Sequence, residues 1–362
     1  MNICILGDGL TALALSKSLI NKKLNVSMYY EKDEHFKDFS TRTIGISKDN
    51  FDYFNKDILK FKNSMFWEIK KIDIYSETSK EEKIIEFEKS GNTLFYILKN
   101  QLICNLLNSE LKKNNLFKKK KIINPNFYKK ILEEKKFDLI INCDNKNVIS
   151  KSLLNKKILK DYNSSAYTTL IKHKKTNNNK AIQIFTKSGP IAFLPISDIE
   201  TSIVFSKLDS KSNFDLKELE AIIHNYKLKF KIKSISQINK FPLHFSFARR
   251  YHKKNIMAFG DMLHRIHPHA GQGFNMTVRD IKILNNIINE HLSLGLQIDS
   301  QIFEKFETRI KHFNLLFSSG VDFIYEFFKI NNNLSNKIIK FFGSNKHLKK
   351  YLTKYADQGI YF

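Results

Sequence analysis

The chain has 362 residues, 42% of them hydrophobic, and 61 Lys and Arg against 36 Asp and Glu give a formal net charge of +25. This hydrophobic content excludes a disordered protein, and the length suffices for two domains or one large composite domain. Only six basic residues are arginine and the lysines are spread along the whole chain. We therefore interpret the charge as a compositional bias rather than a nucleic-acid-binding face, with attraction to an anionic membrane as the alternative.

The N-terminus begins with a strand rather than a signal peptide. No basic region precedes the apolar residues 3–6, and Asp8, which we expect to be a solvated loop residue, interrupts the run. No stretch approaches the length of a membrane-spanning helix. The three cysteines have neither disulfide nor metal-site spacing. We predict a cytoplasmic protein without a metal site, with peripheral attachment at the inner face of the membrane as an open possibility.

The first 31 residues have the pattern of a dinucleotide-binding unit, in which a short strand leads through a glycine turn into a helix. Gly7 would form the tight turn, Gly9 would let the backbone approach a pyrophosphate, and Ala12 is the small residue needed where helix meets strand. Glu31 ends the next apolar run, 24 residues after Gly7. That is near the spacing at which an acid accepts hydrogen bonds from ribose hydroxyls. An ordinary βαβ unit is the alternative.

A second glycine-rich turn lies in residues 255–287. A strand over 255–259 is followed by Asp261, by a turn that holds Gly271 and Gly273, and by a helical pattern. A carboxylate at a strand end can accept from a ribityl hydroxyl, and the free N–H groups after the turn can face an anionic or electron-rich ring.

At this point the sequence resembles a known family. Residues 260–280 resemble the Gly-Asp motif region of the FAD-dependent aromatic hydroxylases. The run Pro-His-Ala-Gly-Gln-Gly-Phe-Asn at 268–275 resembles the ubiquinone-biosynthesis (2-polyprenylphenol) hydroxylase branch in particular. The resemblance implies FAD as cofactor, with Asp261 as one of its ligands. It also implies that the following residues lie at the cofactor: Pro268, Gly271, Gln272, Gly273 and Asn275.

Other segments agree with this resemblance. Residues 41–47 resemble the family's Arg-Ser-x-x-Leu-Ser segment, which places Arg42 against the cofactor; a surface arginine is the alternative. Residues 94–102 resemble a strand-to-helix segment that places Gln101 near the flavin phosphates, with a plain helix residue equally favoured. The strands at 181–185 and 189–195 resemble the pair that roofs the substrate cavity. Phe193 and Pro195 are therefore expected to contact the substrate.

One motif departs from the family. Where the family has Ala-Asp-Gly-x-x-Ser, this chain has Cys-Asp-Asn-Lys-Asn-Val at 143–148. Asp144 is kept, and because Asn145 tolerates left-handed backbone geometry, we expect the turn to persist. In the hydroxylases this motif bears on cofactor and NAD(P)H contacts, so NAD(P)H as the electron donor stays open.

The predicted fold is α/β, with an FAD-binding Rossmann-like domain interleaved with a mixed-sheet substrate domain and followed by C-terminal helices, as in p-hydroxybenzoate-hydroxylase-like proteins. Aromatic residues at helical spacing between 302 and 342 predict a helix that packs on the cofactor domain, with a membrane-facing or partner-facing helix as the alternative. The expected divisions are the FAD-binding domain at 1–65, 94–165 and 241–290, the substrate sheet at 66–93 and 166–240, and the helical region at 291–362.

The resemblance implies a flavin-dependent monooxygenase that hydroxylates the ring of a polyprenylated phenol in ubiquinone biosynthesis. Reduced FAD would react with dioxygen to give a C4a-hydroperoxide that transfers one oxygen atom. No side chain stands out as a catalytic acid or base, and His267 and His269 receive no role. The implied partners are the phenol, dioxygen and either a membrane surface or other enzymes of the pathway, without nucleic acid.

Two alternatives stay open. One is a flavoprotein of the same fold with another substrate, such as a soluble aromatic hydroxylase or an isoprenoid reductase. The other is a catalytically decayed scaffold protein of a biosynthetic complex, which the departure at 143–148 motivates.

Overall fold

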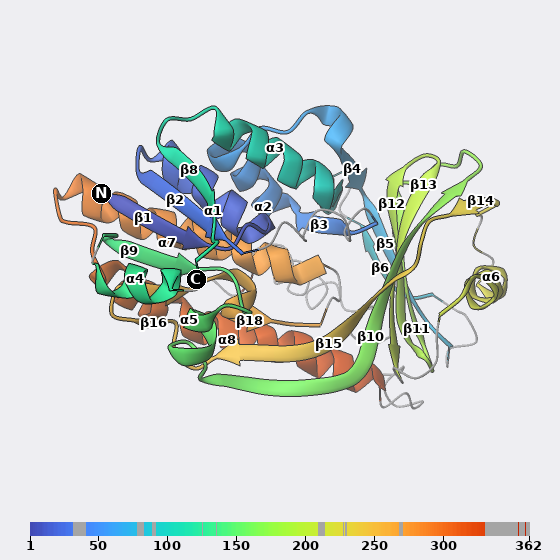
Figure 1. The fold of residues 1–362 in the computed structure, drawn as a ribbon. Coiled ribbons are helices and arrows are strands. Elements are labelled where there is room, and N and C mark those ends of the chain that lie inside the picture. Colours follow the sequence, from blue (N-terminus) through green and yellow to red (C-terminus); the bar gives the residue numbers. More distant parts are fainter. Residues whose placement is uncertain are drawn as a thin grey trace.

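A computed structural model describes most of the chain, and its strands form one six-stranded, one nine-stranded and one three-stranded sheet in the part described (Figure 1). The described residues are 1–31, 41–77, 83–88, 92–124, 126–134, 136–208, 214–226, 228, 230–267, 271–329, 354 and 359.

The six-stranded sheet is mostly parallel and carries the glycine turns. Its order is β16-β17-β9-β1-β2-β8, with only β16 antiparallel to its neighbour. Ile3, Cys4 and Ile5 of β1 are all buried. Parallel strands covered on both faces have continuous apolar runs, which is why the sequence revealed them. The strands are β1 (Asn2–Leu6), β2 (Asn25–Tyr30), β8 (Phe117–Lys121), β9 (Leu139–Asn142), β16 (His252–Lys253) and β17 (Ile256–Ala258).

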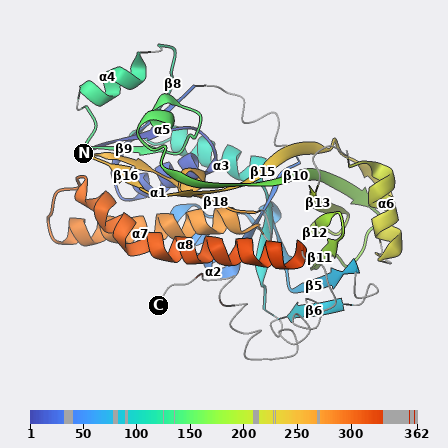
Figure 2. The same ribbon diagram turned by 90° about the horizontal axis from the view of Figure 1, so that it is seen from below.

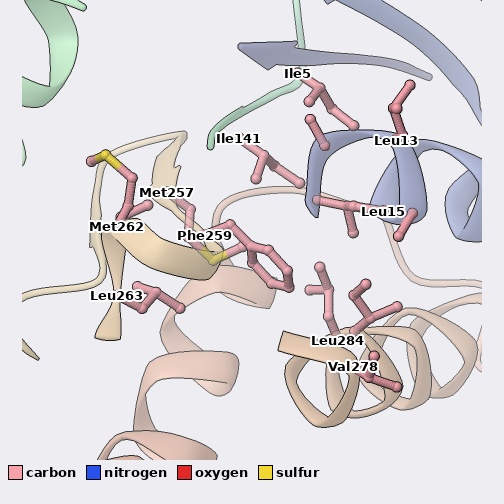
Figure 3. Packing of buried hydrophobic residues seen from close by; sticks show 14 of the residues in the cluster. Ile5, Leu13, Leu15, Ile141, Met257, Phe259, Met262, Leu263, Val278 and Leu284 are labelled. Carbon is pink, nitrogen blue, oxygen red and sulfur yellow. The ribbon is translucent and has the colours of Figure 1, made fainter. Parts of the chain in front are cut away.

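Helices α1 (Leu10–Asn21), α3 (Asn100–Lys112) and α7 (Gln272–Ser293) pack with this sheet in one hydrophobic core. Figure 3 shows the Phe259 ring pointing into the space between α1 and α7, near Leu15 and Leu284. Three short helices, α2 (Lys48–Tyr53), α4 (Phe127–Glu133) and α5 (Val148–Ser152), connect strands around this core.

The nine-stranded sheet is mixed, because β5 pairs parallel to β11 while its other pairings are antiparallel. Helix α6 (Leu216–Asn225) contributes to a hydrophobic core on one face of this sheet. Strands β10 and β15 run from this sheet toward the six-stranded sheet (Figure 1). The strands are β5 (Lys71–Ser76), β6 (Lys83–Glu88), β10 (Lys157–His173), β11 (Lys180–Thr186), β12 (Gly189–Ser197), β13 (Glu200–Leu208), β14 (Ile232–Ile235), β15 (Asn239–Ala248) and β18 (His264–Arg265).

The three-stranded sheet links the two larger ones. It consists of β3 (Thr43–Ser47), β7 (Phe95–Lys99) and β4 (Phe66–Ile69), and β7 leads directly into α3. The Thr43 hydroxyl donates to the Ser202 hydroxyl at 2.8 Å, and Lys99 Nζ lies 2.7 Å from a carboxylate oxygen of Glu200. These contacts hold β3 and β7 against β13 of the nine-stranded sheet.

Helix α8 (Gln301–Lys329) lies beside α7 (Figure 2). Phe303, Phe306 and Phe317 are buried in the core of the six-stranded sheet, which confirms the predicted packing of the aromatic helix. Phe323 differs from them and is 68% exposed. Residues 330–342 of the predicted helical region lie outside the described residues. Within the described chain, no helix combines the length and hydropathy that crossing a membrane requires.

Two glycines with positive φ give a matched test of strand packing. Gly189 has φ +122°, and a Cβ there would lie 2.0 Å from the carbonyl oxygen of Ser206, whereas at Gly295 (φ +65°) a Cβ would meet nothing within 4 Å. We expect Gly295→Ala to cost about 1 kcal/mol of unfolding free energy through backbone strain alone. Gly189→Ala should cost at least about 2 kcal/mol more, because the strands must separate. Urea unfolding measures both, and equal losses would contradict the packing.

Candidate cofactor site

The first glycine turn has the geometry that the sequence predicted. Gly7 has φ +106°, and its N–H donates to the carbonyl oxygen of Tyr29 at 2.8 Å. Gly9 has ordinary backbone angles at the start of α1, and a Cβ there would meet nothing within 4 Å. Ala12 is fully buried. The turn therefore presents the N-terminus of α1 to open space.

Glu31 follows β2 and is held by a tyrosine that the sequence analysis missed. Its carboxylate accepts a hydrogen bond from the Tyr128 hydroxyl of α4 at 2.5 Å. Burial and then Glu31 raise the pKa of Tyr128, so this hydroxyl remains a donor. The two residues are 97 positions apart. Only the pairing of β2 with β8 brings α4 to this edge, so no local pattern could reveal the contact.

Asp8 corrects an expectation. It is 3% exposed rather than solvated, and Lys119 Nζ of β8 lies 3.5 Å from its carboxylate. The same ammonium lies 4.6 Å from the centroid of the Tyr30 ring. The edge strand β8 thus places the Lys119 ammonium beside the glycine turn. A buried carboxylate requires such a cation.

Arg42 and Gln101, which the resemblance assigns to the cofactor, both lie near the start of α3. Burial raises the pKa of Cys104 to about 12, while Arg42 and Lys119 lower it and Asp8 raises it. These charges therefore gather around one helix start. Arg42 is exposed and Gln101 is half-buried in the first turn of α3. The Arg42 carbonyl oxygen also accepts from the Asn100 N–H at 3.0 Å, which ties β3 to α3.

The Gly-Asp turn packs directly on the first glycine helix. Gly260 has φ +66°, and a Cβ there would lie 2.5 Å from Cγ2 of Thr11 in the first turn of α1. Asp261 follows and is exposed. Burial, then Asp144 and then Asp261 raise the pKa of Cys143. Both acids therefore lie close to the β9 end of the sheet.

Gly271 closes the second glycine turn against β3. It has φ +65°, and a Cβ there would lie 3.2 Å from the backbone nitrogen and oxygen of Gly45. Gly273 is the second residue of α7, and a Cβ there would meet nothing within 4 Å. The buried Gln272 accepts from Arg279 Nη2 at 3.2 Å, so its side chain points into the helix packing. The free surface of this turn is backbone.

Asn275 connects α7 to β3 with its whole side chain. Its Nδ2 donates to the carbonyl oxygens of Gly45 at 2.9 Å and Gly271 at 3.1 Å. Its Oδ1 accepts from the Ser47 N–H at 2.9 Å and from Asn50 Nδ2 at 3.2 Å. Since both N–H groups and the oxygen are engaged within the chain, Asn275 positions the turn.

Pro268, which the resemblance placed beside the ring, lies with residues 269 and 270 outside the described part of the chain. The neighbouring His267 is buried. Its ring stacks on Tyr325 at a centroid distance of 4.1 Å and meets Tyr162 edge-on at 5.2 Å.

The structure corrects the predicted substrate contacts. Phe193 is fully buried and stacks on Phe230, in the core that α6 covers. Pro195 is also buried and, two residues on, shares that face of β12. Because side chains alternate along a strand, both residues point to the buried face of β12 rather than to its opposite face.

The opposite face of the nine-stranded sheet turns toward β3. Cross-strand pairing puts Gln183, Ala192, Val204 and Asn239 in one row on this face. Asn239 Nδ2 donates to the Thr41 hydroxyl at 2.7 Å, just before β3. The first three side chains in this row are only partly buried. They are the candidate lining of a substrate space, and their row includes Ala192, the residue adjacent to Phe193 on β12.

The degenerate motif at 143–148 keeps its turn. The Lys146 N–H donates to Asp144 Oδ1 at 2.8 Å, and the Ser150 N–H donates to Asn147 Oδ1 at 2.9 Å. Asn147 and Asn142 also exchange side-chain hydrogen bonds. Asn145 does not have the positive φ we expected; polar side chains replace the missing glycine geometry.

A basic cluster beside Asp261 was not predicted. Arg265 Nη1 lies 2.6 Å from His244 Nε2, which accepts from the guanidinium as a neutral ring. Burial, Arg265 and Lys157 lower the pKa of His244, although Asp161 opposes them. Burial and Arg265 likewise lower the pKa of Lys157, and Asp261 offsets only part of this shift. The cluster joins β10, β15 and β18, so only the folded sheet assembles it.

Together these features fit FAD. Open space lies beside two helix starts, at Gly9 and at Gly273, and Arg42 supplies a cation near the start of α3. Backbone N–H groups at helix starts suit a diphosphate, and the acids Glu31 and Asp261 suit ribose and ribityl hydroxyls.

Comparison with known proteins agrees with the geometry. The family described as FAD binding domain matches residues 155–295. The 3-demethoxyubiquinol 3-hydroxylase of Escherichia coli (strain K12) is 30% identical over 158 residues, spanning 42% of this chain and 40% of that protein. The mitochondrial ubiquinone biosynthesis monooxygenase COQ6 of Danio rerio is 27% identical over 212 residues, spanning 47% and 44%. The chain is thus related to the ubiquinone-biosynthesis hydroxylases. The matched regions span less than half of these relatives.

Solved structures share the fold at low identity. The p-nitrophenol 4-monooxygenase PnpA of Pseudomonas putida DLL-E4 has a TM-score of 0.76 at 12% identity, covering 99% of this chain and 98% of its own. Klebsiella pneumoniae HpxO, complexed with FAD and uric acid, has a TM-score of 0.74 at 11% identity, covering 99% and 97%. The predicted α/β fold of the aromatic hydroxylases is therefore confirmed.

The role of Asn275 can be tested through stability. We expect Asn275→Ala to lower the unfolding free energy by about 3 kcal/mol, because the Ser47 N–H and the Gly45 carbonyl lose their partner in a buried site. Asn286→Ala is the control, since Asn286 is exposed on the same helix and its loss should change stability by less than about 0.5 kcal/mol. Similar effects of both substitutions in urea unfolding would refute the positioning role.

Proposed function

We propose that this chain is an FAD-dependent monooxygenase that hydroxylates the aromatic ring of a polyprenylated phenol in ubiquinone biosynthesis. The observation that carries the proposal is the pair of helix starts with open space at Gly9 and Gly273, fixed by the contacts of Gly260 with Thr11 and of Gly271 with Gly45. The names of the relatives supply the substrate class.

The proposal gives the site residues distinct roles. The backbone at Gly7 and Gly9, with Ala12 keeping the helix close, would hold the diphosphate with Arg42 and Gln101. Glu31 would accept from the ribose and Asp261 from the ribityl chain. The following residues would border or position the flavin ring: Pro268, Gly271, Gln272, Gly273 and Asn275.

Bound FAD supplies the redox chemistry, taking electrons from a donor and activating dioxygen. The protein must hold the phenol ring and keep water away from it. Val204 and Ala192 offer apolar surface on the sheet face turned toward β3, and Gln183 offers an amide beside them. Replacing Gln183 would therefore affect orientation of the ring, whereas Phe193 acts only through the sheet core.

We also propose the division into domains that the sequence predicts. The predicted boundaries near 165 and 241 fall within β10 and β15, the two strands that run between the larger sheets. Membrane association is also proposed: a net charge of +25 and a polyprenylated substrate both favour a position at an anionic bilayer surface.

Gly9 offers a test that separates binding from folding. Gly9→Asp places a favourable N-cap residue at α1 but adds a negative charge where the diphosphate would lie. We expect unchanged or higher stability and a loss of FAD affinity on the order of 100-fold, measured by flavin fluorescence titration. Gly9→Ser, an N-cap of similar size without the charge, is the control. Wild-type affinity in Gly9→Asp would argue against the assigned diphosphate position.

The reaction is tested with isotopically labelled dioxygen and a polyprenylated phenol. The protein reconstituted with FAD and a chemical reductant should give a product with one labelled oxygen atom. A reduced, unlabelled product would indicate a reductase of the same fold. Complementation of a deletion strain by Asp261→Ala, which should cripple FAD binding, would instead favour the scaffold alternative.

A further inference from the structure

A groove on the opposite end of the six-stranded sheet from β8 plays no part in the cofactor site. It has a volume of about 710 Å³ and lies between the β16–β17 hairpin and the first half of α8. Its lining is mostly charged and ends at one apolar side chain. The lining includes Arg250, Lys253, Lys254, Glu307, Lys311 and Leu315.

One acid in this groove is already fully engaged. Glu307 accepts from Lys311 Nζ at 2.7 Å, from the Tyr251 N–H at 2.9 Å and from His252 Nδ1 at 3.1 Å. Burial opposes the shift, but the hydrogen bonds from Lys311 and Tyr251 lower the pKa of Glu307. Glu307 therefore remains ionised and organises the groove wall, and Lys311 balances its charge.

Three cations remain available. Arg250, Lys253 and Lys254 are exposed and make no ion pair with any described residue, and the only other lining carboxylate is Glu304. The groove therefore keeps a net positive charge. Such a surface suits phosphate groups, which accept hydrogen bonds from several cations at once.

The backbone at Lys254 points to the same role. Lys254 and Asn255 form the two-residue turn between β16 and β17, and Lys254 has φ +55°. The first central position of such a turn favours glycine when φ is positive. Lysine is a strained choice there, as it is at Lys23 (φ +61°), and at Lys254 it places a cation at the groove edge.

The apolar end of the groove continues along α8. Leu315 lines the groove. Leu316, the next residue, and Phe323, two turns further on, share the neighbouring side of α8 and are 56% and 68% exposed. A basic surface that adjoins exposed Leu and Phe side chains has the composition of a membrane-interface surface, in which the cations meet phosphates and the apolar groups enter the boundary region. A soluble phosphate compound would use the cations but not these side chains.

We propose that this groove, with Leu316 and Phe323, is the surface by which the protein docks on an anionic phospholipid bilayer. The inference rests on the membrane association proposed above and names the surface responsible for it. It does not depend on FAD or on the hydroxylation reaction.

The test is vesicle co-sedimentation with the full chain, comparing phosphatidylcholine vesicles with vesicles that also contain phosphatidylglycerol. The groove variant combines Arg250→Gln, Lys253→Gln and Lys254→Gly, the last of which relieves the strained turn. We expect it to lose affinity for anionic vesicles on the order of 100-fold, since each cation near the surface contributes about 1 kcal/mol, or about fivefold. Phe323→Ala should lower affinity for the same vesicles by less than the triple variant does.

A matched control removes equal charge elsewhere. Lys112→Gln, Lys118→Gln and Lys120→Gln change exposed lysines around β8, and this variant should stay within about fivefold of wild type if the groove is the docking surface. Equal losses in the two triple variants would overturn the inference, because the binding would then depend on overall charge. The inference would also be overturned if the wild type bound neutral and anionic vesicles equally, or bound neither kind.

Two further readouts keep the outcomes distinct. The unfolding midpoint of the control variant should match wild type and that of the groove variant should match or exceed it, so a loss of binding cannot come from misfolding. If purified wild type binds no FAD but shows the predicted vesicle differences, the docking surface stands and the proposed monooxygenase fails. Flavin binding without vesicle binding gives the reverse result.

Discussion

The cofactor site depends on close contacts that two glycines make with segments far apart from them in the chain. The Gly271 turn lies against the Gly45 backbone, and Gly260 lies against Thr11 at the start of α1. A Cβ at Gly260 would overlap the Thr11 side chain and one at Gly271 would crowd the Gly45 backbone, and both turns use a positive φ that favours glycine. The helix starts of α1 and α7 are thereby fixed relative to each other, and Asn275 holds the second contact with four hydrogen bonds.

The three-stranded sheet transmits this arrangement to the substrate side. Because β3 contacts α7 and also bonds to Ser202 through Thr43, a single strand relates the glycine turns to the face of the nine-stranded sheet. The same sheet explains why Phe193 is unsuitable as a contact residue: it belongs to the layer between the sheet and α6. Ring-holding side chains must come from the alternate positions of those strands.

The positive charge divides into structurally different groups. Lys119 neutralises a buried acid in the first glycine turn, and Lys157 lies with Arg265 and His244 beside Asp261. Other lysines are exposed on the edge strand β8, where charge discourages edge-to-edge association. The groove cations differ from all of these because they adjoin exposed apolar side chains of one helix. Individual lysines thus have distinct structural roles, although lysine is abundant along the whole chain.

The sequence by itself determined the α/β fold, the two glycine turns and the relationship to aromatic hydroxylases, because backbone geometry at Gly7, Gly260 and Gly271 leaves a local pattern that no other residue satisfies equally well. The tertiary structure alone decided which face of β12 is covered, which tyrosine holds Glu31, and where Asp8 finds its cation. The first depends on the packing of α6, and the other two depend on the pairing of β2 with β8; the chain carries no local pattern for either. The groove likewise exists only because α8 packs across a hairpin far from it in sequence.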